Sequence, residues 1–373
     1  MREAAASLRK AIVLRPDWAQ PHVLLSRVLV AQGRPAEGIQ HLSETLKTYP
    51  DNRLVRLSYA RLLVAERKYG LALEEFRRLH KSDKDDREVH YAYAMMATQQ
   101  SAWDEARPLW QSLRNDPKFR DEATYFLGQV EELDGNSALA IGLYKSVDKS
   151  HFRVDALIRA ASLLADQDQL LAGRDLLAEA RITEPERAED IYLSELQMLQ
   201  KAEADPEVIL RLYATAIKAF PESNDLIYNR GLYYSDLGRF DAMEVDFQAV
   251  LARDEDHAES LNALGYMLAD RGVRLDEALT YIHRAHKLRP DNAAILDSLG
   301  WAYYRKGDYQ TALRYLREAV QASDQDDEIA AHFGEVLWIS GEQAEARNVW
   351  RSALEVVPES KHLRAVMERF LSE

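Results

Sequence analysis

The sequence contains no cysteine among its 373 residues, which excludes disulfides, thiolate nucleophiles and cysteine-based zinc sites. Glycine and proline are few, at 15 and 11, and no Ser/Gly-rich linker divides the chain. It also lacks an apolar run long enough to span a bilayer and a signal peptide at Met1. Basic residues number 48 against 62 acidic ones, a net charge of −14, which argues against nucleic acid as a partner and against a basic membrane-binding surface.

What the chain does have is a small residue that recurs about every 34 positions. Gly231, Gly265, Gly300 and Gly334 follow one another at intervals of 34, 35 and 34 residues. A large side chain follows each of them by 16 or 17 residues, at Phe247, Ile282, Leu316 and Trp350. A small residue at a fixed place indicates that a second helix approaches too closely for a larger side chain. The period therefore predicts stacked helix pairs.

The same register continues through most of the chain. Toward the N-terminus the small position is filled by Ser26, Ala60, Ala94, Gly128 and Ala160. Glycines that favour a helix C-terminus mark the turn inside the last four units, at Gly238, Gly272, Gly307 and Gly341. Ten units follow, at 19–52, 53–86, 87–120, 121–152, 153–186, 187–223, 224–257, 258–292, 293–326 and 327–360. The unit at 187–223 is the least regular, with extra residues around "KAEADPE".

This pattern resembles the tetratricopeptide repeat, a helix–turn–helix of 34 residues. The resemblance covers nearly the whole chain and is clearest in the last four units. It implies an all-α fold, a right-handed superhelical solenoid of about ten helix–turn–helix units over residues 19–360. An ordinary helical bundle is the weaker interpretation, because a bundle does not require a fixed period.

The two ends of the sequence differ from a whole repeat. Residues 1–18 fit the second helix of a truncated repeat, with Leu8 and Ile12 as an exposed apolar face, so we expect more protein upstream of Met1. Residues 361–373 predict a C-terminal cap helix with one apolar stripe, formed by Leu363, Val366, Met367, Phe370 and Leu371.

The sequence offers no constellation of residues typical of an enzyme. It has no glycine-rich phosphate loop and no HExxH motif. His283 and His286 lie three apart on a predicted helix, but no carboxylate stands at ligand spacing, so surface histidines are the better interpretation. The acidic runs at 83–86 and 324–327 fall at unit junctions, where turns and helix N-caps explain them. We therefore expect no catalytic residue, no cofactor and no bound metal.

The remaining candidate is a binding surface on the inner wall, which the first helices of such repeats line and where peptides bind. Inward-facing side chains are predicted one residue after the small position and three before it. In the last four units this strip, with neighbours one turn on, contains Tyr228, Asn262, Tyr266, Asp297, Trp301, Tyr304 and Trp338. Trp301 is expected on the open wall, whereas Tyr303 is expected in the core. The strip suits an amphipathic helix or an extended chain of a protein partner, unless each aromatic only packs between helices.

Two further resemblances bear on function. Chaperone-tail adaptors with this repeat clamp a carboxylate with a lysine and an asparagine, a pair that no unit here contains, which disfavours that role. Residues 261–320 resemble tetratricopeptide lipoproteins of Gram-negative envelopes. That resemblance implies an adaptor on the periplasmic side of the outer membrane, with its lipid anchor upstream of Met1. It would bind a periplasmic carboxyl-terminal processing protease and present cell-wall hydrolases to it.

Two alternatives remain open at this point. The chain could be the repeat region of a larger enzyme, such as a glycosyltransferase, although the predicted cap helix at 361–373 disfavours a catalytic domain after it. It could also be a cytoplasmic assembly factor without a membrane link. All three interpretations give it protein partners and no nucleic acid.

Overall fold

The computed structural model describes residues 1–148, 150–323 and 326–371, and all regular secondary structure within them is helical. The last two residues of the predicted cap helix and the first two of the acidic run at 324–327 lie outside the described residues. None of the described helices combines the length and the apolar character needed to cross a bilayer. The chain divides into two compact units, residues 1–204 and 205–373.

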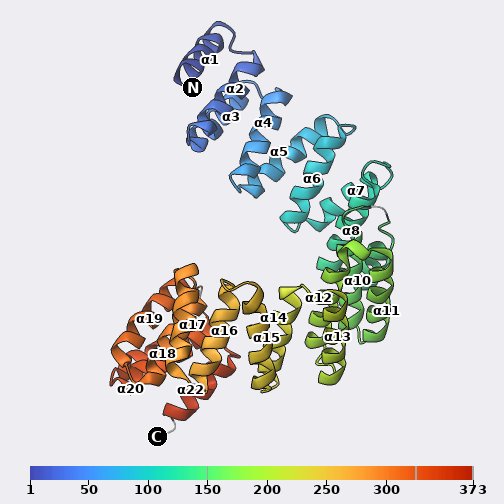
Figure 1. Ribbon diagram of the computed structural model, residues 1–373. Helices are drawn as coiled ribbons and strands as arrows, with labels where there is room; N and C mark the ends of the chain where they lie inside the picture. The colour runs from blue at the N-terminus through green and yellow to red at the C-terminus, as the bar shows by residue number, and fades with distance from the viewer. Residues whose placement is uncertain (149, 324–325, 372–373) are drawn as a thin grey trace. The chain divides into compact units, whose positions relative to one another are not determined.

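The first unit contains twelve α-helices and one short 3-10 turn among its described residues (Figure 1). They are α1 (Arg2–Leu14), α2 (Ala19–Ala31), α3 (Pro35–Thr48), α4 (Arg53–Ala65), α5 (Tyr69–Ser82), α6 (Arg87–Gln99), α7 (Trp103–Leu113), α8 (Arg120–Leu133), α9 (Ser137–Lys145), α10 (Arg153–Asp166), α11 (Leu170–Thr183), η1 (Pro185–Arg187) and α12 (Ala188–Lys201).

The second unit contains ten α-helices among its described residues. They are α13 (Pro206–Ala219), α14 (Asn224–Asp236), α15 (Phe240–Arg253), α16 (Ala258–Asp270), α17 (Leu275–Leu288), α18 (Ala293–Lys306), α19 (Tyr309–Ala322), α20 (Asp327–Ile339), α21 (Gln343–Val356) and α22 (Lys361–Leu371). The division between the units falls inside the irregular stretch "KAEADPE" at 201–207.

The order of the helices confirms the predicted all-α solenoid. Between α1 and α22 the described chain runs through ten successive helix pairs, from α2 and α3 to α20 and α21. Within each unit, successive helices pack on their neighbours, and every second helix also contacts the next first helix, as α17 does with α18. Stacking of this kind gives each unit a core that continues from one pair to the next.

The small residues are where the predicted close approach of helices occurs. A Cβ atom placed on Gly300 would lie 2.5 Å from Leu316 Cγ, and one on Gly231 would lie 2.6 Å from Phe247 Cε1. Gly265 and Gly334 would collide in the same way with Ile282 and Trp350. Each collision is with the large residue that the period places on the second helix, so this part of the prediction is confirmed.

The turn inside each pair has one backbone conformation regardless of the residue that occupies it. Gly307 has a φ of 86°, and the next amide, Asp308 N, donates to Tyr303 O at 3.0 Å, which closes the helix C-terminus. Among the described residues, ten pairs each have one such left-handed turn position: Gly33, Arg67, Ser101, Gly135, Asp168, Glu203, Gly238, Gly272, Gly307 and Gly341. Four of them are not glycine, and an L-residue there is strained by about 1–2 kcal/mol.

Both ends of the chain are covered by packing. At the N-terminus, α1 lies on α2, and Leu8 and Ile12 are half-buried against Leu25 and Leu29. The expectation that Leu8 and Ile12 form an exposed face is therefore wrong, because α2 covers that side of α1. At the C-terminus, the predicted apolar stripe of α22 packs on α20 and α21, with Leu363 fully buried.

The strain at the turns predicts opposite effects of substitution at two equivalent positions. Arg67→Gly should stabilise the protein by about 0.5–1 kcal/mol, because glycine adopts the positive φ without strain. Gly307→Ala should destabilise it by about 1 kcal/mol through backbone conformation alone, since an added Cβ at Gly307 meets nothing within 4 Å. Thermal midpoints of the two variants measure this, and a loss of stability in Arg67→Gly would contradict it.

Candidate protein-binding site

The second unit carries a cavity of about 330 Å³ on its first-helix wall, the surface formed by α14, α16, α18 and α20. Four of the seven predicted site residues line it together: Tyr228, Asn262, Tyr266 and Asp297. Leu232, which is 37% exposed, adds an apolar side chain to the same wall. The cavity therefore combines aromatic, apolar and polar side chains from successive repeats.

The helical period explains why these residues meet. Asn262 and Tyr266 are four apart on α16, so their side chains share one face of that helix. Tyr228 and Leu232 have the same spacing on α14. Because successive first helices repeat this geometry, residues 34 or 35 apart in sequence lie side by side on the wall.

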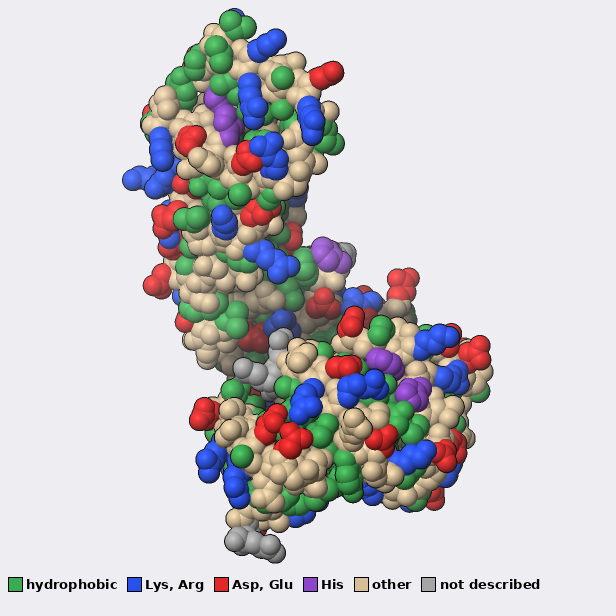
Figure 2. Space-filling view, turned by 90° about the vertical axis from the view of Figure 1, so that its left-hand side faces the viewer, with side chains coloured by type: hydrophobic (Ala, Val, Ile, Leu, Met, Phe, Trp, Pro, Cys, Tyr) green, Lys and Arg blue, Asp and Glu red, His purple; other side chains and the backbone are tan. Residues whose placement is uncertain are grey.

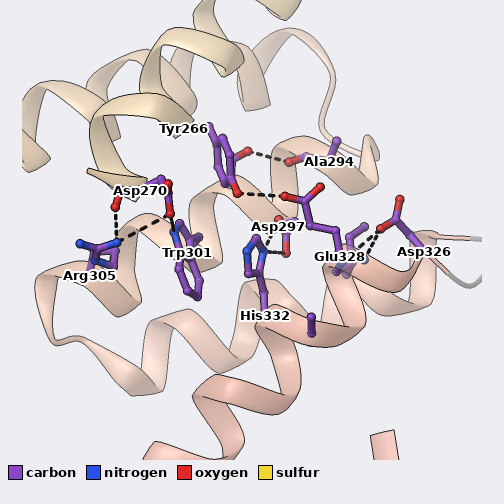
Figure 3. Close-up of polar contacts among 12 residues, drawn as sticks. Tyr266, Asp270, Ala294, Asp297, Trp301, Arg305, Asp326, Glu328 and His332 are labelled. Carbon is purple, nitrogen blue, oxygen red and sulfur yellow. Dashed lines mark hydrogen bonds and ion pairs between the residues drawn. The ribbon is translucent and has the colours of Figure 1, made fainter. Parts of the chain in front are cut away.

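Hydrogen bonds tie α16 and α18 to α20 beneath the cavity (Figure 3). The Tyr266 hydroxyl donates to Glu328 Oε1 at 2.9 Å, across three repeats of sequence. The His332 imidazole Nδ1 lies 2.9 Å from Asp297 Oδ2 and 3.1 Å from Oδ1. Asp297 is only 5% exposed, so its charge is held by this pair rather than by water.

Burial and charge oppose each other at His332. Burial of the imidazole disfavours its charged form, but the Asp297 carboxylate, helped by Glu328 and Glu335, outweighs burial and raises the pKa of His332 above its ordinary value. At Tyr266, burial followed by the nearby carboxylates raises the pKa of the phenol strongly, so it stays protonated and donates to Glu328. The cavity floor therefore carries negative electrostatic potential.

Trp301 does not lie on the open wall. Its side chain is 7% exposed, its Nε1–H donates to Asp270 Oδ1 at 3.1 Å, and its indole stacks on His332 with ring centroids 4.1 Å apart (Figure 3). Tyr303, expected in the core, is only partly buried and stacks on Tyr315. The expected roles of the two residues are thus reversed, because His332 from the next repeat covers Trp301.

The two remaining predicted residues lie further along the wall and do not line the cavity. Tyr304 donates its hydroxyl to Glu335 Oε1 at 3.0 Å, and burial followed by Glu335 raises the pKa of Tyr304 to about 12. Trp338 stacks on Trp350 and Phe370, with ring centroids 5.8 and 5.9 Å away. Trp338 therefore packs against the cap helix α22 as much as it faces the wall.

The sequence analysis missed three charged residues that line the cavity, Glu259, Glu328 and Arg289. The two glutamates stand six residues before Gly265 and Gly334, and Asp225 holds the same place before Gly231. A third inward-facing position, six before the small residue, was therefore readable from the period. Arg289 belongs to the loop after α17 and had no such signal.

The other candidate sites have structural explanations. Asp86 and Asp326 cap α6 and α20, and each carboxylate accepts from the amides two and three residues later, as expected for the acidic runs. His283 lies on the surface within 3.0 Å of the Tyr303 hydroxyl. Within the described residues, no three His, Cys, Asp or Glu side chains are grouped so that they could hold a metal ion.

Comparison with known families explains the repeat. Models described as tetratricopeptide repeat match residues 29–96, 228–282 and 256–325. The chain contains tetratricopeptide repeats. The matched models describe a repeat and not a catalytic family, and two of them fall on helices that line the cavity.

One curated relative extends the likeness beyond the matched repeats. The TPR repeat-containing protein PA4667 of Pseudomonas aeruginosa is 41% identical over 315 residues, which make up 84% of this chain and 53% of that protein. The chain thus spans about half the length of the relative.

Solved structures are similar to this chain at low sequence identity. Yeast Tom70 has a TM-score of 0.50 and 14% identity, covering 99% of this chain and 91% of that one, which shows the fold alone. A thermophilic TPR protein of Thermus thermophilus has a TM-score of 0.45 and 21% identity, covering 50% of this chain and 100% of its own.

The burial of Trp301 predicts its effect on stability. Trp301→Ala should destabilise the protein by about 3–5 kcal/mol, because it leaves a cavity beside His332 and an unpaired Asp270. Tyr303→Ala should be milder, since the Tyr303 ring is partly exposed. Denaturant midpoints of the two variants measure the difference, and an unchanged midpoint for Trp301→Ala would show that the indole is not part of the core.

The raised pKa of His332 predicts a pH dependence with a definite sign. The stability contributed by the charged pair is fully present below the unfolded-state pKa of about 6.5 and is lost as the pH rises through the higher folded-state pKa. The difference in thermal midpoint between the wild type and His332→Gln should therefore shrink as the pH rises above about 6.5. His362→Gln, at an exposed position on α22, is the matched control. A His332→Gln difference that is independent of pH would contradict the charged pair.

Proposed function

We propose that this chain is a non-enzymatic scaffold that binds protein partners on the first-helix wall of its second unit. Tetratricopeptide repeats generally act as protein-binding scaffolds, and this chain contains them in both units. The observation that carries the proposal is the cavity of about 330 Å³, which brings Tyr228, Leu232, Asn262 and Tyr266 together on one wall. Partly exposed aromatic and apolar groups around a concavity are the usual anchors of a protein–protein interface.

We further propose that the partners are a periplasmic carboxyl-terminal processing protease and the cell-wall hydrolases presented to it. Support comes from the resemblance of residues 261–320 to outer-membrane lipoprotein adaptors and from the absence of a lysine–asparagine carboxylate clamp. In this proposal the chain works on the periplasmic side of the outer membrane, held there by a lipid anchor upstream of Met1. The protease would supply the chemistry and this chain the contacts.

Binding to the purified protease and to a purified hydrolase tests the proposal. Leu232→Ala should weaken binding of one of them by about tenfold or more, because its side chain lies at the cavity. Val245→Ala on α15 is the matched control, since Val245 is an exposed apolar residue outside the cavity. Affinity is measured by isothermal titration, and degradation of the hydrolase by the protease is followed with and without the chain.

Three results would contradict the proposal. The first is equal binding by Leu232→Ala and Val245→Ala, which would place the interface elsewhere. The second is binding of neither protein, which would remove the proposed partners. Hydrolase degradation by the chain without the protease would contradict the non-enzymatic role.

A further inference from the structure

A second cavity adjoins the first and enlarges the surface available to a partner. It has a volume of about 590 Å³ and shares Tyr228, Ala258, Glu259 and Arg289 with the first cavity. Together the two cavities reach from α14 across α16 and the loop after α17 to α18 and α20. This is long enough for an extended segment of several residues rather than a single side chain.

The side chains around this pair of cavities are strongly unbalanced in charge. Six carboxylates line them, and Arg289 is the one lysine or arginine among the described residues of their lining. The carboxylates are Asp225, Asp254, Asp256, Glu259, Asp297 and Glu328. By contrast, acidic and basic side chains are interspersed over the face of the molecule in Figure 2.

Internal partners neutralise only part of this charge. Arg289 lies 2.5 Å from Glu259, and His332 pairs with Asp297. Arg284 approaches Asp256 at 3.9 Å, a long and exposed ion pair of little strength. Asp225 and Asp254 form no ion pair with any described residue. The cavities thus hold negative charge for which the described part of the chain supplies too few cations.

The first cavity also offers a planar environment and a free acceptor. Tyr228 and Tyr266 both line it with their rings. Asn262 Oδ1 is buried and accepts no hydrogen bond from the described residues. Burial, followed by Glu259, raises the pKa of Tyr228, as burial and carboxylates do at Tyr266, so both rings stay neutral. Aromatic faces, carboxylates and a spare carbonyl oxygen are the groups that bind a guanidinium.

We propose that the two cavities bind an extended basic segment of a protein partner, with an arginine side chain in the cavity lined by Tyr228, Asn262 and Tyr266. This inference rests on the proposed scaffold function and names the chemistry that its site selects. An arginine would stack on a tyrosine and donate to Asn262 and Glu328, while a further basic residue would meet Asp225 and Asp254. The negative charge equally disfavours phosphorylated, acidic or carboxylate-terminal ligands.

Three blocked heptapeptides test the charge and the shape separately. Each is acetyl-Gly-Ala-X-Ala-X-Ala-Gly-amide, with X as arginine, as lysine or as citrulline, the neutral analogue of arginine. Titrated into the full chain at low salt, the arginine peptide should bind about tenfold more tightly than the citrulline peptide. The lysine peptide should fall between them, because an ammonium has the charge without the planar fork. Binding should weaken as salt is added.

Matched variants locate the binding site. Asp225→Asn combined with Glu328→Gln should weaken the arginine peptide by about tenfold, while the new amide oxygen at position 328 can still accept from Tyr266. Asn262→Asp should strengthen it by a few-fold, because the new carboxylate replaces the free carbonyl without enlarging the side chain. Glu355→Gln, an exposed carboxylate on α21, is the control and should change nothing. Circular dichroism confirms that each variant keeps its helix content.

Several outcomes would overturn the inference. Equal affinity for the arginine and citrulline peptides would remove the charge argument, and no binding of any peptide would remove the basic segment. Tighter binding of the lysine peptide would remove the guanidinium, and unchanged binding by the Asp225 and Glu328 double variant would place the peptide elsewhere. None of these results would affect the loss of partner binding expected for Leu232→Ala, so the scaffold function is tested independently.

Discussion

The contact between a small residue on each first helix and a large side chain on its second helix is the constraint on which the structure depends. At Gly300 the backbone of α18 comes so close to Leu316 that a single added carbon would lie 2.5 Å from Cγ. This closeness fixes the spacing of the two helices, and the repeat of the spacing fixes where the next pair stacks. The wall of first helices is a consequence of that stacking.

The wall acquires its properties because each first helix uses its small face for the core and leaves the opposite face to its neighbours. Residues such as Asn262 and Tyr266 then lie beside Asp297 from the next repeat, although they are far apart in sequence. Cross-repeat bonds, such as Tyr266 to Glu328, hold the side chains around the cavity in place. A cavity built in this way is ready for a partner without rearrangement, which lowers the entropic cost of binding.

Much of this was readable from the sequence, because the fold depends on residue size at a fixed period. The small positions, the turn glycines and the apolar stripe of α22 all follow from such patterns. Trp301 was misplaced because its burial depends on His332, which lies on the next repeat and carries no periodic signal. The left-handed turn at Arg67 was unreadable for a related reason, since tertiary packing imposes a conformation that arginine does not favour.

A double-mutant cycle between Gly300 and Leu316 tests the central constraint most directly. Gly300→Ala should destabilise α18 and α19 by about 1–3 kcal/mol through overpacking, and Leu316→Ala by about 2–5 kcal/mol through a cavity. Hydrogen exchange of the amides in these helices, measured in the full chain, gives both values and that of the double variant. The close-approach account predicts that the double variant is more stable than the sum by at least about 1 kcal/mol, because the new methyl group fills space that Leu316 vacates. Additive effects, within about 0.5 kcal/mol, would show that the two residues do not set the helix spacing.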